Sequence, residues 1–73
     1  MRSHLRVVNT MPTPEECRRI RERAGVSQTV VAESIGVTRS AVSAWEAGRR
    51  RPMRSVAAAY LRVLEVLREA VAA

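Results

Sequence analysis

A tight break at Gly36–Val37–Thr38 separates two short helical patterns, and it constrains the fold of this chain more than any other feature. Gly36 suits a backbone with positive φ, and Ser27 and Thr38 stand where each can cap the helix that follows it. Apolar residues recur at helical spacing on both sides, with Val31, Ala32 and Ile35 before the break and Ala41, Val42 and Trp45 after it. The pattern predicts helices over Gln28–Ile35 and Arg39–Ala47 that cross closely at the small side chain of Ala32.

One helix is expected before this pair and one after it. Thr13 can cap a helix that begins at Pro14, and Glu16 completes a capping box with Thr13. This helix is predicted to end near Ala24, because a glycine follows. From Arg54 to Ala72 the helical pattern is continuous and contains neither glycine nor proline. No segment alternates like a strand, so the chain is predicted to be all-α with a long C-terminal helix.

The charge balance favours a polyanionic partner. The chain has thirteen arginines, no lysine and seven glutamates, which give a net charge of +6 and a pI of about 11.5. Nucleic acid suits such a surface best, a membrane surface or an acidic protein is an alternative, and a compositional bias of the genome would also produce it. Trp45 and Tyr60 are the only aromatic residues, which argues against base stacking on single strands or RNA and favours duplex DNA.

The first residues show no helical pattern. We expect residues 1–12 to form a flexible basic segment and residues 13–73 to form one domain, with the central helix pair at 27–47. The segment is either a frayed tail or a basic arm in which Arg2 and Arg6 contact phosphates or a minor groove. The spacing of its residues does not decide between the two.

Several classes of function lack the residues that they need. Cys17 is the only cysteine and His4 the only histidine, so neither a disulfide nor a metal site is expected within one chain. Aspartate and lysine are absent, no catalytic constellation is evident, and we expect neither an enzyme nor a cofactor or small-molecule ligand. No apolar stretch approaches the ~20 residues of a membrane span and no signal peptide is evident, so the expected location is the cytoplasm.

The central helix pair is part of a longer pattern that runs from Arg21 to Pro52. Its elements are Ser27–Gln28, Ala32, Ile35–Gly36–Val37, Thr38, Val42, Glu46–Ala47–Gly48 and the arginines at 49–51 before Pro52. This pattern resembles the phage repressor/Cro-like family of helix-turn-helix proteins, often called the Xre family. The resemblance implies a small four-helix, lambda-repressor-like DNA-binding domain whose second short helix enters the major groove. Common members break the C-terminal part into two helices, whereas this chain shows one continuous pattern.

The resemblance and the exposed side chains together give a set of candidate contacts. Arg39 is the expected reader of guanine, because its guanidinium fork matches O6 and N7 of that base. The other candidate base contacts are Ser40, Ser43 and Ala44, and the candidate phosphate contacts are Gln28, Thr38, Arg49, Arg50 and Arg51. The resemblance also implies a structural ion pair between Arg21 and Glu46.

The pattern therefore implies a sequence-specific transcriptional regulator that binds a double-stranded operator. A repressor of phage Cro or immunity type is the leading interpretation, and an antitoxin-type autoregulator or a protein-interaction adaptor is the alternative. The helix at 54–72 has an apolar stripe wider than one neighbour requires, since Leu61 and Val66 flank it. Its spare surface is expected either to pack against the N-terminal segment or to join two copies into a homodimer.

Overall fold

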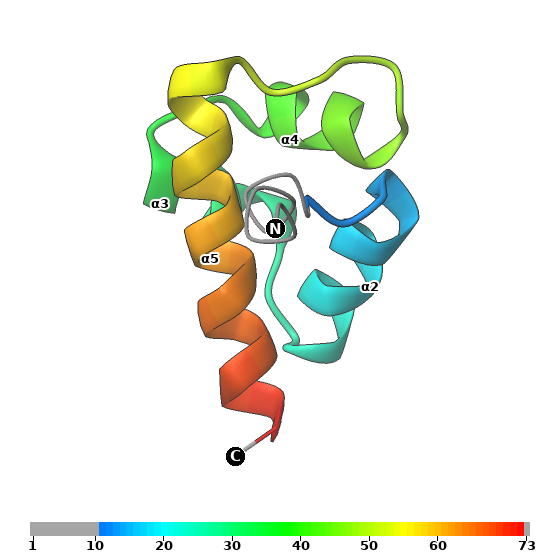
Figure 1. Cartoon of the computed structure of the whole chain (residues 1–73), viewed down its shortest axis with the longest axis vertical. Helices are drawn as coiled ribbons and strands as arrows, with labels where there is room; N and C mark the ends of the chain where they lie inside the picture. The colour runs from blue at the N-terminus through cyan, green and yellow to red at the C-terminus, as the bar shows by residue number, and fades with distance from the viewer. Residues whose placement is uncertain (1–10, 73) are drawn as a thin grey trace, which may run out of the picture.

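The computed structural model describes residues 11–72 of the 73-residue chain. Over that range the chain forms four α-helices and no strand: α2 (Pro14–Arg23), α3 (Gln28–Ile35), α4 (Arg39–Glu46) and α5 (Arg54–Ala72) (Figure 1). The predicted all-α fold with a long C-terminal helix is thus confirmed. The predicted ends of the first and third helices were one residue too long, because Ala24 and Ala47 are the C-cap residues.

Side-chain caps begin the first three of these helices. The Thr13 hydroxyl accepts from the backbone N–H of Glu16 (3.1 Å), and the Glu16 carboxylate accepts from the N–H of Thr13 (3.2 Å), which completes the capping box. Ser27 caps α3 and Thr38 caps α4 through the side-chain oxygen alone, without the reciprocal bond of a capping box. Between those two helices Gly36 has φ +90°, which a residue with a side chain rarely adopts. Local chemistry therefore sets where each short helix begins and how α3 turns into α4.

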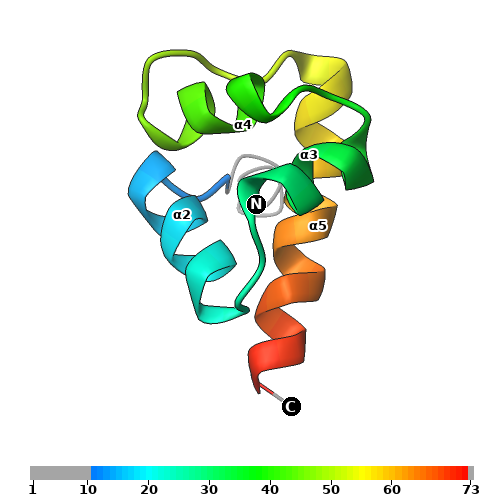
Figure 2. The same cartoon turned by 180° about the vertical axis from the view of Figure 1, so that it is seen from behind.

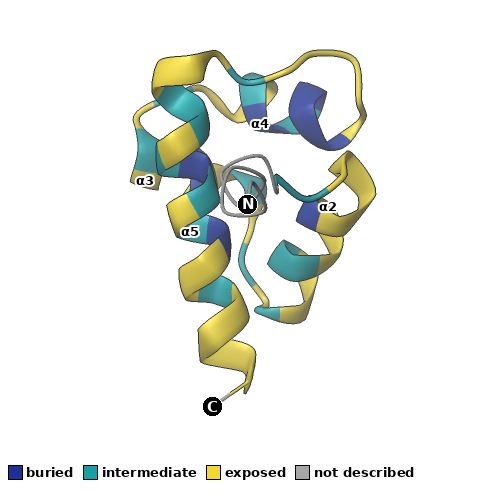
Figure 3. Cartoon of the chain, in the orientation of Figure 1, coloured by how far each residue is buried: buried dark blue, intermediate teal, exposed yellow. Residues whose placement is uncertain are grey.

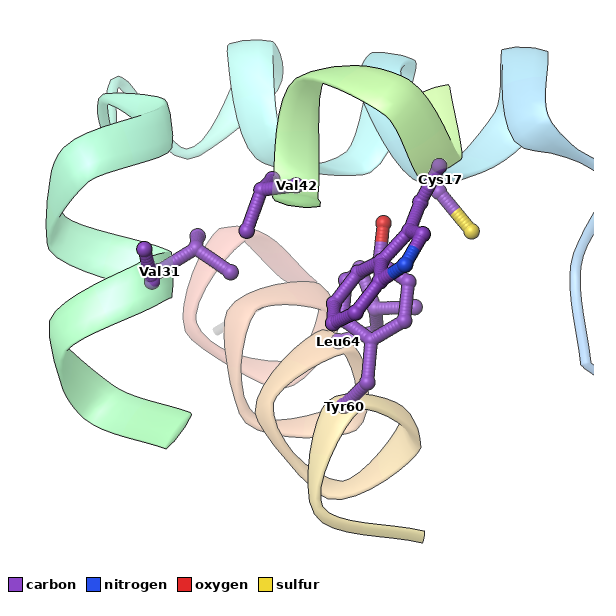
Figure 4. Close-up of a cluster of buried hydrophobic side chains, with 7 residues drawn as sticks. Cys17, Val31, Val42, Tyr60 and Leu64 are labelled. Atoms are coloured by element: carbon purple, nitrogen blue, oxygen red, sulfur yellow. The ribbon is translucent and has the colours of Figure 1, made fainter. Parts of the chain in front are cut away.

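The helices enclose one core. α5 runs the length of the molecule and contacts α2 and α3. α4 also contacts α2 and α3, and it lies at the end of the molecule away from the C-terminus (Figures 1 and 2). The buried apolar side chains come from all four helices: Cys17, Val31, Ala32, Val42, Trp45, Tyr60 and Leu64, most of which Figure 4 shows. The rings of Trp45 and Tyr60 lie 4.8 Å apart between centroids, which ties α4 to α5. Ala32 is 2% exposed, so a small residue does lie where α3 meets its neighbours.

The last turns of α5 extend past this core. Figure 3 shows them as almost wholly exposed, and the side chains of Val66 and Val71 are 57% and 48% exposed. The basic arm expected at Arg2 and Arg6 lies outside the described residues. Met11 packs against the core, and the carbonyl of Pro12 accepts from the Cys17 thiol (3.6 Å), so the packed part of the chain includes these two residues.

Candidate nucleic-acid interface

The start of α4 presents three of the predicted contact residues on the surface. The side chains of Thr38, Arg39 and Ser40 are exposed, and Ser43, one turn further along, is half-buried. Thr38 also caps the helix, since its hydroxyl oxygen accepts from the N–H of Ala41 (3.1 Å). Arg39 is therefore a long cationic side chain at the exposed start of a short helix, with two hydroxyl groups beside it. This arrangement suits a helix end that is inserted into a groove.

The prediction that Ala44 is exposed as a base contact is wrong. Ala44 is 5% exposed, although a helical wheel places it beside the exposed Ser40. Its carbonyl accepts from the N–H groups of Arg49 (2.9 Å) and Arg50 (3.4 Å), in the C-terminal cap of α4 around Gly48. A methyl group buried in this way cannot meet a thymine methyl. Ala44 is therefore a packing residue, and the base-reading candidates are reduced to Arg39, Ser40 and Ser43.

The connection from α4 to α5 carries the three consecutive arginines. Arg49, Arg50 and Arg51 are all exposed, and none of them is ion-paired with a residue in the described range 11–72. Gly48 turns the chain with φ +77°, so the arginines follow directly after the end of α4. Three unpaired cations beside the exposed face of α4 can neutralise phosphates on a duplex that contacts that face.

Glu46, the last residue of α4, connects this surface to the rest of the domain. Its carboxylate accepts from Arg21 Nε (2.6 Å) and Nη2 (3.0 Å), which gives the two-pronged pairing that guanidinium and carboxylate favour. Arg21 Nη1 also donates to the carbonyl of Val26 (2.9 Å). The Glu46 side chain is 4% exposed and that of Arg21 12%. The hydrogen bonds to Glu46 raise the pKa of Arg21, so this half-buried guanidinium stays charged.

Gln28 takes part in the same network, which the sequence did not reveal. Its side-chain amide donates to Glu46 Oε1 (3.0 Å), so α2, α3 and α4 all meet at one carboxylate. The residue is half-buried at the first position of α3, with its amide nitrogen already engaged. The donors left for the predicted phosphate contact by Gln28 are the second hydrogen of its amide group and the backbone N–H at the start of α3. The two residues are 18 positions apart, and no local pattern links them.

Comparison with known proteins agrees with this geometry. A model of the helix-turn-helix family matches residues 18–69, which covers α3, α4, the arginine connection and most of α5. Comparisons with curated proteins and with solved structures find no significant match. No helix in the described range is long and apolar enough to cross a membrane. The family consists of DNA-binding regulatory domains rather than enzymes. The chain belongs to the Xre-like helix-turn-helix family of DNA-binding domains.

Proposed function

We propose that this DNA-binding regulator is a sequence-specific repressor of phage Cro or immunity type, which acts by occupying an operator in the cytoplasm. One observation carries the proposal: the exposed Arg39 and the unpaired arginines at 49–51 lie at the two ends of a helix that Glu46 holds to the body. A reading side chain and a phosphate clamp thereby flank one helix that is fixed to the body. Repression by occupancy needs nothing more than such a surface.

The side chains of this surface divide into two roles. Arg39 reads a guanine through its O6 and N7, and Ser40 and Ser43 donate to or accept from neighbouring base edges or phosphates. Arg49, Arg50 and Arg51 hold the phosphate backbone, with Thr38 at the start of α4 and the free N–H groups at the start of α3 beside them. Base contacts select the site, and phosphate contacts supply most of the affinity.

Selection of bound sequences from a random duplex pool tests the proposal directly. It should return a motif with a guanine under Arg39. Arg39→Ala should weaken binding to that motif by about 1–3 kcal/mol and relax preference at one base pair, while binding to random duplex changes little. If Arg39→Ala weakens both duplexes equally, Arg39 contacts phosphate. If the pool yields no motif, the protein binds DNA without sequence preference.

A homodimer is the proposed form on DNA. The support is the apolar side chain of Val66 on the last turns of α5, which is 57% exposed. A twofold dimer should select a palindrome whose half-sites lie about 10 base pairs apart. Analytical ultracentrifugation of the free and the bound protein gives the stoichiometry. A single unsymmetrical half-site occupied by one chain contradicts the dimer.

A further inference from the structure

A groove between α2 and the last turns of α5 is unrelated to the surface described so far. It has a volume of about 380 Å³ and lies between α2 and the C-terminal end of α5. Its main lining residues are Glu16, Arg19, Ile20 and Arg23 from α2 and Arg68 and Val71 from α5.

The groove combines cations with an apolar floor. Arg19, Arg23 and Arg68 are exposed, and none of them forms an ion pair with another residue of the range 11–72. Ile20 and Val71 contribute the apolar part of the lining, with Val71 48% exposed. The nearby carboxylate of Glu16 is already used, because it accepts from the N–H of Thr13 (3.2 Å). The groove is therefore lined by three cations (its rim) and by the apolar side chains of Ile20 and Val71 (its floor).

No residue of α4 lines this groove. On α2, Arg18, Arg21 and Glu22 line a different hollow, which they share with Gln28, Ser43 and Glu46 next to the candidate DNA surface. Arg19 and Arg23 are one turn apart, and the helical period places them on a different side of α2 from those residues. A molecule in the groove would leave the outer face of α4 free.

We propose that this groove binds an acidic amphipathic helical segment of a partner protein. Carboxylates one turn apart on such a helix match the spacing of Arg19 and Arg23, and an apolar side chain between them rests on Ile20 and Val71. A nucleic-acid backbone would use the arginines but would leave the apolar floor without a partner. The combination of rim and floor therefore favours a peptide, and the partner would reach the regulator while it is bound to DNA.

A designed peptide tests this proposal without knowledge of the natural partner. The probe is a fluorescein-labelled helix of about 15 residues with paired glutamates and leucines at helical spacing, and its anisotropy is followed as the full chain is added. Binding should saturate, weaken with salt and persist when the protein is saturated with duplex. Arg19→Glu and Arg68→Glu should each weaken binding by about tenfold or more, because each places a like charge against the peptide.

Arg62→Glu is the matched control. Arg62 is an exposed arginine on α5 outside the groove, and its substitution changes the net charge by the same amount. It should alter peptide binding by less than about twofold. Unchanged circular dichroism and unchanged duplex binding by all three variants show that each is folded, and duplex binding itself reports on the proposed regulator independently of the peptide.

Four results would overturn the proposal. They are no binding of the peptide, equal loss of binding in Arg62→Glu, equal binding of a peptide that has glutamates but no leucines, and displacement of the peptide by random duplex. The last result would identify the groove as a second nucleic-acid surface. Sedimentation provides a fifth: if the chain alone is a dimer that Arg19→Glu converts to monomers, the groove is occupied by a second copy.

Discussion

At the scale of single residues, Glu46 is the side chain that links the most helices through hydrogen bonds in the described range. It ends α4, pairs with Arg21 of α2 and accepts from Gln28 of α3. We predict that Glu46→Gln lowers the free energy of unfolding by about 3 kcal/mol, because it leaves the half-buried Arg21 without its counter-charge. Urea denaturation followed by circular dichroism measures the change.

Arg18 and Glu22 offer a control for this substitution within the same fold. They also form a pair, with nitrogen and oxygen 3.1 Å apart, but their side chains are 63% and 53% exposed. Glu22→Gln should therefore cost less than about 0.5 kcal/mol. Similar losses for Glu46→Gln and Glu22→Gln would mean that burial does not strengthen the Arg21–Glu46 pair.

Tyr60, unlike Glu46, has a buried polar atom without a hydrogen-bond partner. Its hydroxyl is buried and has no hydrogen-bond partner in the described range. Burial raises the pKa of this phenol well above its usual range, and the adjacent Cys17 raises it further. Burial likewise raises the pKa of the Cys17 thiol. Both groups stay neutral in the folded protein at pH values where the unfolded chain ionises.

The sign of the pH dependence follows from those two raised pKa values. The two groups destabilise the folded protein only above the unfolded pKa of the thiol, about 8.5. The free energy of unfolding falls as pH rises through that value and through the unfolded pKa of tyrosine, about 10.

Tyr60→Phe should remove the fall in stability near the unfolded pKa of tyrosine. It should also raise the free energy of unfolding at neutral pH by about 1 kcal/mol, since an unpaired hydroxyl is lost. Thermal melts between neutral pH and pH ~11 check both statements. A destabilised Tyr60→Phe would show that the hydroxyl is paired in solution.

At the scale of elements, the helices were largely predictable and their contacts were not. Thr13, Ser27, Thr38 and Gly36 act on neighbours within a few residues, so their effect can be read along the chain. The burial of Ala44 depends on how α4 sits in the assembled fold, and the helical period of α4 alone does not indicate it. Helical periodicity finds the inner face of one helix, but it does not show what covers the other faces.

The candidate site divides in the same way. The exposure of Arg39 and Ser40 follows from the helical period of α4, and the pairing of Arg21 with Glu46 came only through a family resemblance. The hydrogen bond from Gln28 to Glu46 came from neither source, because it depends on how α3 sits against α4 in space. Interactions that join three helices can be identified only once the assembled fold is known.

Gly36 gives a prediction that belongs to the pair α3 and α4. A Cβ added there would meet nothing within 4 Å, so the cost of a side chain is backbone strain at φ +90° and not a clash. Gly36→Ala should destabilise the domain by about 1–2 kcal/mol, and Gly36→Asn by less, since asparagine tolerates the left-handed region better. Equal losses for both variants in urea denaturation would point to a contact that strain does not explain.

At the scale of the whole molecule, the distribution of the +6 net charge separates two arginine surfaces. One comprises Arg39 and the connection at 49–51, beside α4, and the other lines the groove between α2 and α5. If only the first surface contacts DNA, the effect of removing an arginine on DNA affinity depends on where that arginine lies and not on the net charge that remains. Long-range attraction alone would make all arginines equivalent.

A pair of triple variants distinguishes these cases. Replacing Arg49, Arg50 and Arg51 by alanine should lower the slope of log affinity against log salt by up to ~0.9 for each lost phosphate contact, or ~2.7 in all. Replacing Arg19, Arg62 and Arg68 by alanine removes the same number of exposed charges away from α4 and should leave the slope nearly unchanged. Anisotropy of a labelled operator duplex across a sodium chloride series measures both. Equal slopes for the two variants would mean that the arginine connection makes no phosphate contacts and that DNA senses only the net charge.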